Sequence, residues 1–246
     1  PSNPKQHGIY HEAILDAGFG TALLEYVLKR KRKDGEAGAL SARTYTTIKR
    51  EWLKDIPEPS FTSLEQSNSS LRFGKQHYLK IFRRLEEGPN PEIEIGAHFS
   101  TRAPFENATH LVGALMYEQD NKEYALGVVH DYVEAQRSAW DFFVDQIDQI
   151  SEPVSTLNPD DYADVYDAEA SFFGFKSKKG TPEWFRENLG YTSSLMTTLG
   201  RRTGEMHNAL SADSATPDFK PEDITPFYQR SLYQSLRNRA ERVHAE

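Results

Sequence analysis

Alternating side chains mark residues 78–82, where Lys80 shares one predicted face with two aromatic residues, opposite Leu79 and Ile81. Successive side chains of an extended segment point to opposite faces, so this pattern predicts a strand. The pair Gly74-Lys75 comes just before it and is suited to the tight turn of a hairpin. One lysine is therefore expected to project from the middle of a half-buried strand.

The same patterns extend on both sides of this strand and predict a β-rich stretch with one inserted helix, over residues 61–133. Pro91 is suited to the first turn of a helix expected over 92–100. A second hairpin is predicted from strands at 111–118 and 124–133, turning around 119–122.

From residue 135 onward, apolar residues recur at helical spacing. This part is predicted to contain a helix through 140–150, a loop over 151–161, a helix start at 180–183, and helices at 191–210 and 227–243. The threonine and proline of the helix start are residues that favour the cap and the first turn.

The first segment is predicted to be mainly helical, with one helix through Phe19 and Val27 and further helical material at 45–53. A basic run over 29–33 follows the first helix. At a helix C-terminus its cations lie near the negative end of the helix dipole, which is favourable, and Gly35 is available for the cap. A localisation signal or nucleic-acid patch is the less favoured alternative.

Composition narrows the classes of function. The 246 residues are 37% apolar and carry a net charge of −8, which argues against a nucleic-acid binder. The sequence has no cysteine, so disulfides and thiolate sites are excluded. We find no apolar run near the length of a membrane span and no signal-peptide pattern. We therefore expect a cytoplasmic protein without nucleic-acid or membrane partners.

Residues 64–85 combine the features with the clearest chemistry. They read as strand, small polar loop, strand, glycine turn and strand, with Lys80 in the last strand. A loop of small hydroxyl and amide residues can lie close to phosphates, and a lysine on a neighbouring strand can reach them. This layout is typical of the nucleotide-binding lobe of a kinase-like fold.

Several segments, in order, resemble the maltokinase module that is found fused to trehalose synthases. They are the run 65–70, the lysine strand with its basic pair at 79–85, and the segments 88–96, 113–117, 132–140 and 199–207. Upstream, residues 16–40 resemble the end of the cap region that precedes the kinase lobe. The resemblance covers most of the chain and is weaker at 150–185.

The resemblance implies ATP-dependent phosphorylation of maltose to maltose 1-phosphate, with Mg²⁺ in the complete enzyme and a fused or associated trehalose synthase as partner. Lys80 would contact the α- and β-phosphates, held by Glu94, for which Glu92 is a rival. The loop would cover the phosphates, and hinge backbone groups would bind adenine. The implied loop and hinge residues are Gln66, Ser67, Asn68, Ser69, Ser70, Asp131, Tyr132 and Val133.

In that family a His-Gly-Asp-x-His motif supplies the base and a later Asp-x-Glu holds Mg²⁺. Neither follows His207 in this sequence. We therefore assign no catalytic residue and no metal ligand. We expect the chain to be a fragment of a larger protein that lacks the catalytic C-terminal part and is inactive when isolated.

The expected fold class is α+β, with a five-stranded antiparallel lobe containing one helix. The predicted boundaries are a cap remnant over 1–59, a nucleotide-binding lobe over 60–136, and the incomplete helical part of a second lobe over 137–246. The alternative function is a non-catalytic kinase-like scaffold that docks on a trehalose synthase or another partner.

Overall fold

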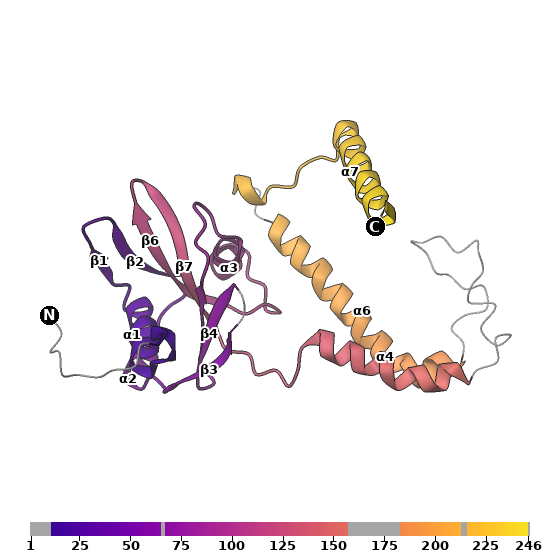
Figure 1. Ribbon diagram of the computed structural model, residues 1–246, viewed down its shortest axis with the longest axis horizontal. Coiled ribbons are helices and arrows are strands. Elements are labelled where there is room, and N and C mark those ends of the chain that lie inside the picture. Colours follow the sequence, from indigo (N-terminus) through magenta and orange to yellow (C-terminus); the bar gives the residue numbers. More distant parts are fainter. Residues whose placement is uncertain (1–10, 65–66, 157–182, 213–215, 246) are drawn as a thin grey trace.

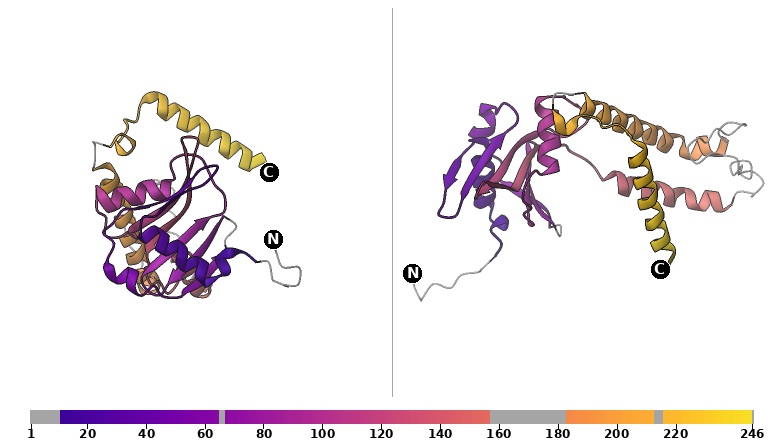
Figure 2. Two further views of the ribbon diagram at one scale, coloured as in Figure 1. Left: turned by 90° about the vertical axis from the view of Figure 1, so that its left-hand side faces the viewer. Right: turned by 90° about the horizontal axis from the view of Figure 1, so that it is seen from above.

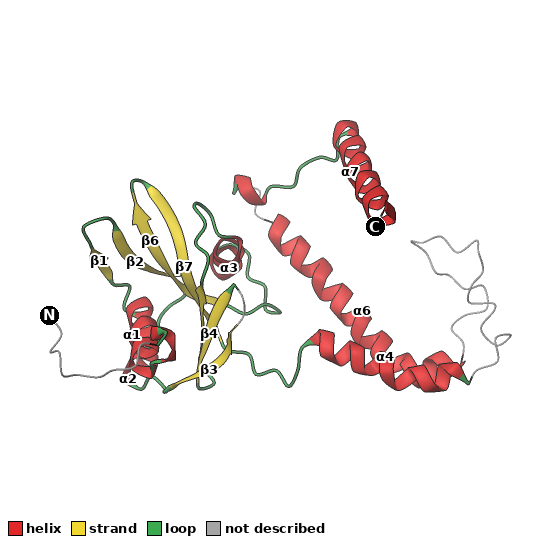
Figure 3. Cartoon of the chain, in the orientation of Figure 1, coloured by secondary structure: helices red, strands yellow, loops and turns green. Residues whose placement is uncertain are grey.

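A computed structural model describes residues 11–64, 67–156, 183–212 and 216–245. It has the expected α+β class, with one antiparallel sheet and helices (Figures 1 and 3). The strands are β1 (Arg32–Asp34), β2 (Ala39–Thr44), β3 (Pro59–Leu64), β4 (Asn68–Phe73), β5 (His77–Phe82), β6 (Leu111–Gln119) and β7 (Lys122–Asp131). The helices are η1 (Ala13–Leu15), α1 (Ala17–Leu28), α2 (Arg50–Lys54), α3 (Pro91–Thr101), α4 (Ala139–Ser155), α6 (Glu183–Ser211), η3 (Pro217–Phe219) and α7 (Pro226–Ala245).

The sheet has seven strands in the order β1-β2-β6-β7-β5-β4-β3, and every neighbouring pair is antiparallel. Strands β3 to β7 lie in the region predicted as the lobe, and α3 follows β5 and precedes β6 along the chain. The five strands predicted for this lobe are present, but the prediction of a mainly helical first segment is wrong in part, because β1 and β2 of that segment extend the sheet beyond β6. The apolar signal of β2 is weak, with mostly small residues, so its pairing with β6 decides its conformation.

Helices cover both faces of the sheet. On one face, Leu24 and Val27 of α1 pack against a buried cluster that includes Phe73 and Leu79. On the other face, Ile93 of α3 packs against side chains of β6 and β7. The alternation predicted for β5 is confirmed, because Leu79 is fully buried on the α1 face while Lys80 lies on the α3 face. The lysine therefore projects toward α3.

The ends of α1 follow ordinary capping chemistry with one departure. Asp16 caps the start, since its side chain accepts a hydrogen bond of 2.8 Å from the Phe19 amide. At the other end Arg30, with φ of 50°, takes the left-handed conformation that usually favours glycine. The predicted cap role of Gly35 is therefore wrong. The basic run divides, since Lys29 ends the helix and Arg32 begins β1.

The second hairpin and the inserted helix are confirmed with small shifts in their bounds. Asp120 and Asn121 both have positive φ, which suits a two-residue turn between antiparallel strands. The helix expected over 45–53 is reduced to the five residues of α2. The predicted loop over 151–161 is wrong in its first part, because α4 continues to Ser155, and its remainder from 157 lies outside the described residues.

The long helices extend away from the sheet (Figure 2). Helices α4 and α6 contact each other locally, where Thr192 donates a 2.9 Å hydrogen bond to Gln146. The sheet together with α1, α2 and α3 is called the sheet lobe below. After α6 the chain returns to it, and Phe219 stacks on His98 of α3 with ring centroids 3.9 Å apart. Within the described parts of the chain, no helix is both long and apolar enough to cross a membrane.

Candidate functional site

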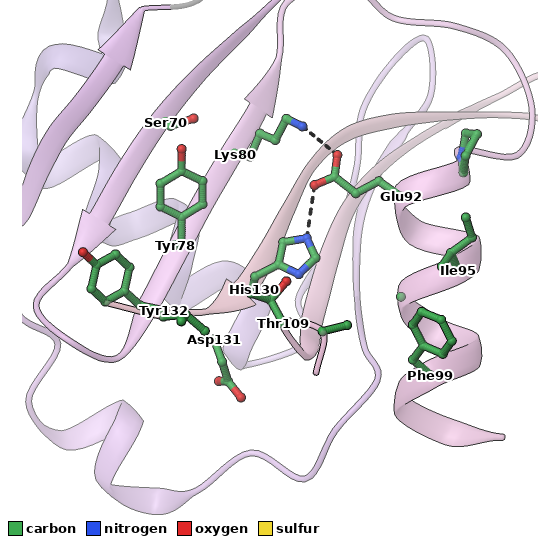
Figure 4. Close-up of a pocket in the computed structure, with 14 residues that line it drawn as sticks. Ser70, Tyr78, Lys80, Glu92, Ile95, Phe99, Thr109, His130, Asp131 and Tyr132 are labelled. Atoms are coloured by element: carbon green, nitrogen blue, oxygen red, sulfur yellow. Dashed lines mark hydrogen bonds and ion pairs between the residues drawn. The ribbon is translucent and has the colours of Figure 1, made fainter. Parts of the chain in front are cut away.

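A cleft of about 600 Å³ lies between the sheet and α3 (Figure 4). Its walls come from β4, β5, the end of β7, the segment after β7, the segment just before β6, and one side of α3. The lining residues are Ser70, Tyr78, Lys80, Pro91, Glu92, Ile95, Gly96, Phe99, Ala108, Thr109, His130, Asp131, Tyr132 and Val133. A cleft of this size can hold a small-molecule ligand.

Strand register brings the polar side chains of the cleft together. Ser70 of β4 lies directly opposite Lys80 of β5. Two residues away along β5, Tyr78 lies opposite His130 of β7. Directly opposed residues of an antiparallel pair lie on the same face with neighbouring Cβ atoms. Four residues from three strands therefore line one wall of the cleft.

Lys80 is held by Glu92. Its Nζ donates a hydrogen bond of 2.7 Å to Glu92 Oε2, and the same ammonium lies 5.6 Å from the centre of the Phe82 ring. Glu92 is in the first turn of α3, which Asn90 caps by accepting hydrogen bonds from the Glu92 and Ile93 amides at 3.0 and 3.3 Å. The cap and Pro91 fix this turn, and the helix dipole favours a carboxylate there.

The prediction that Glu94 pairs with Lys80 is wrong, and its rival Glu92 takes that place. Two residues along a helix turn the side chain by about 200°, so Glu92 and Glu94 point to different sides of α3. Glu94 instead lines a separate groove with Arg43 and Lys122. The tilt and rotation of α3 against the sheet decide between the two carboxylates.

Glu92 also has a second partner. Its other oxygen, Oε1, lies 3.2 Å from His130 Nε2, so both carboxylate oxygens are engaged (Figure 4). Burial raises the pKa of Glu92, but hydrogen bonds from His130 and Lys80 and their positive charges outweigh it, so the net pKa is lowered. At neutral pH the group is therefore a carboxylate that links α3 to two strands.

The hinge segment is fixed by backbone hydrogen bonds. The Asp131 amide donates to the carbonyl of His110 at 3.0 Å, and the Tyr132 amide donates to that of Gln76 at 2.9 Å. The Asp131 carboxylate points away from Lys80 (Figure 4), and its oxygens lie 3.5 Å from His110 Nδ1 and 3.8 Å from His77 Nδ1. All three predicted hinge residues, Asp131, Tyr132 and Val133, line the cleft.

The polar loop differs from the prediction. Asn68, Ser69 and Ser70 belong to strand β4, because they pair with β5. Of the predicted loop residues that the structure describes, only Ser70 lines the cleft, and Ser69 is buried and accepts a 2.9 Å hydrogen bond from Arg83. Ser67 is exposed at the turn, and Gln66 lies outside the described residues.

Sequence reasoning did not place several cleft residues in the site. Tyr78 was recognisable, because the alternation in β5 puts it on the same face as Lys80. Ile95 and Phe99 follow Glu92 at helical spacing and form the α3 wall. No local pattern indicates the contact of His130 with Glu92, because the two residues lie 38 positions apart in the sequence.

These residues divide the cleft by chemistry. Near Lys80 it offers a cation with hydroxyl groups, which suits phosphate oxygens. Toward the hinge it offers aromatic and apolar side chains beside fixed backbone, which suits a planar base. Within the described ranges, no three His, Asp or Glu side chains gather in a way that could hold a metal ion.

Comparison with known proteins gives a partial likeness. No protein-family model matches the chain. Among solved structures, a glucosamine kinase (crystal form B) is similar, with 19% sequence identity and a TM-score of 0.43. The match covers 80% of this chain and 38% of that kinase, so this chain spans well under half of its length. At this level of overlap, the functional case depends on the cleft's own residues.

Proposed function

We propose that the sheet lobe binds ATP in the cleft and is the nucleotide-binding portion of an ATP-dependent sugar phosphotransferase. The observation that carries the proposal is the 2.7 Å ion pair between Lys80 on β5 and Glu92 on α3, in a cleft that also reaches the hinge. A strand lysine held by a helix glutamate is how kinases present a cation to nucleotide phosphates. Lys80 then contacts the α- and β-phosphates.

The hinge supplies the base subsite in this proposal. The Tyr132 amide is already bonded to Gln76. In the described part of the chain, the Val133 amide has no backbone hydrogen-bond partner, and Val133 is exposed. A free donor at the edge of an apolar wall can pair with a ring nitrogen of adenine. The base would then lie beside Tyr78 and Tyr132, with its phosphates directed toward Lys80.

The finer proposal is that the parent enzyme is a maltokinase, which converts maltose to maltose 1-phosphate. It is supported by the ordered sequence segments that resemble that family, including the strand of Lys80 and the helix of Glu92. The sugar, Mg²⁺ and a trehalose synthase would be engaged by the complete enzyme. In the alternative proposal the lobe has the same fold but binds no nucleotide and serves as a non-catalytic scaffold that docks on a partner.

Thermal unfolding with added ATP or ADP tests the nucleotide proposal. Ligand at 100 times its dissociation constant stabilises a protein by about 2.7 kcal/mol, or roughly 5 °C or more in Tm for a chain of this size. Lys80→Ala removes the phosphate cation. We expect nucleotide affinity to fall roughly tenfold or more, since a charge-assisted hydrogen bond contributes about 1.5–3 kcal/mol.

Lys75→Ala is the matched control. Lys75 lies at the turn before the same strand, outside the cleft, and pairs with Glu134 on the surface. This variant should keep the full nucleotide response, and circular dichroism should show all three proteins folded. An absence of nucleotide stabilisation in the unmodified chain, or an equal response in Lys80→Ala, would contradict the proposal and favour the scaffold.

Turnover is a separate question from binding. Because neither catalytic motif of the family follows His207, we expect this chain to consume no ATP when maltose is added. A coupled ADP-release assay at saturating maltose measures this directly. Maltose-dependent release above the rate of hydrolysis without sugar would show that the phosphoryl-transfer groups are present in this chain.

A further inference from the structure

His130 occupies a position that the kinase layout by itself does not assign. It lies on β7 between Tyr78 of β5 and Leu111 of β6, so both neighbouring strands hold its backbone. Its ring is mostly buried and reaches Glu92 Oε1 at 3.2 Å. A carboxylate can only accept, so Nε2 carries the proton of this hydrogen bond. Among the described residues, Nδ1 is buried without a partner.

The side chains of Lys80, Glu92 and His130 differ in how many torsions must be fixed to hold them in place. Lysine and glutamate lose much rotamer freedom when they are fixed, whereas the His130 side chain has two torsions and is mostly buried in the cleft wall. Glu92 presents one oxygen to each partner. The histidine can therefore orient the carboxylate, and the oriented carboxylate can then fix the lysine.

We propose that His130 is a positioning residue, which holds Glu92 in the orientation that directs Lys80 toward nucleotide phosphates. The proposal rests on the proposed ATP-binding function. Because His130 immediately precedes the hinge residue Asp131, it also connects the wall that meets the base to the cation that meets the phosphates. Its effect passes through Glu92 rather than through contact with the ligand.

Chemical labelling of Lys80 tests the positioning step without any nucleotide. His130→Leu removes the donor, whereas His130→Gln keeps an N–H at a similar reach. With a lysine-acylating reagent and mass spectrometry, we expect Lys80 to be labelled several-fold faster in His130→Leu, approaching Glu92→Gln. The His130→Gln variant should label at the original rate. His207→Leu, at an exposed histidine on α6, is the control for a general loss of histidine.

Nucleotide titration gives the second readout. His130→Leu should weaken ADP binding roughly tenfold and adenosine binding less than twofold, because only ADP reaches Lys80; His130→Gln should restore ADP binding. Equal Lys80 labelling in His130→Leu and the original chain would overturn the proposal, as would an equal loss of ADP and adenosine affinity. If the original chain binds no ADP, the proposed function fails, and labelling still decides the role of His130.

Discussion

The sheet lobe and the helices after residue 138 differ in how far their apolar side chains are buried. In the lobe, Phe73 and Leu79 are completely buried between the sheet and α1. On the helices, Trp140 of α4, Tyr191 of α6 and Phe227 of α7 are 77%, 70% and 83% exposed. The difference shows that an amphipathic pattern buries a residue only when a second surface meets it.

The two regions also differ in what holds them together. Each strand of the lobe is paired along its length, and helices pack on both faces of the sheet. Helices α4 and α6 contact each other less than neighbouring strands of the lobe do. Their contacts include the Thr192–Gln146 hydrogen bond and the Phe142–Tyr191 ring pair, whose centroids are 6.4 Å apart. We therefore expect the stability of the protein to reside in the lobe, and three matched pairs of substitutions test this difference.

The largest expected effect comes from a pair of phenylalanines. Phe73→Ala opens a cavity in a fully buried core site, which typically costs about 3–5 kcal/mol of unfolding free energy. Phe227→Ala on α7 removes a side chain that is 83% exposed, so its effect should stay within about 0.5 kcal/mol. Urea unfolding followed by circular dichroism measures both. Equal losses would show that α7 is packed against a partner in solution.

A pair of glycine substitutions should change the free energy of unfolding by a smaller amount, with a loss at one position and a gain at the other. A Cβ at Gly127 would lie 2.5 Å from the Lys80 carbonyl oxygen, so Gly127→Ala must separate β5 from β7 and should cost about 1–3 kcal/mol. A Cβ at Gly200 of α6 would meet no described atom within 4 Å beyond its own stretch of helix, so Gly200→Ala should stabilise the helix by up to about 1 kcal/mol. A stability gain in Gly127→Ala would contradict the tight β5–β7 contact. The measurement is again urea unfolding.

The smallest expected effect is on pH dependence. Burial lowers the pKa of His77, although the Asp131 carboxylate partly opposes this. Below about pH 6.5 the unfolded chain takes up a proton that the folded chain resists, so this contribution to stability is present above pH 6.5 and is lost as pH falls. His77→Phe should flatten that part of the stability profile, measured by urea unfolding between pH 7.5 and 5.5.

The control for this profile is His207→Phe, at an exposed histidine on α6, which should leave the slope unchanged. His77→Phe keeps the ring that meets Trp52 edge-on at 4.6 Å, so the variant preserves part of the packing. An unchanged slope in His77→Phe would mean that His77 titrates normally in the folded protein.

Much of the lobe could be predicted because its signals are local. The alternation around Lys80, the Asn90–Pro91 helix start and the Asp120–Asn121 turn each involve residues close in sequence. Strand β2 was missed because its small side chains give little pattern of their own. The extent of the polar loop was overestimated because small hydroxyl residues such as Ser70 suit both turns and buried strand positions.

The sequence by itself determined which side chains share a face of an element, since backbone geometry repeats every two residues in a strand and every 3.6 in a helix. It thereby put Lys80 with Tyr78, and Glu92 on a different side of α3 from Glu94. Only the tertiary structure decided which faces meet. The packing of α3 on the sheet chose Glu92 for Lys80, and the register of β7 brought His130 to the same carboxylate. These contacts join residues 12 and 38 positions apart, where spacing within one element gives no information.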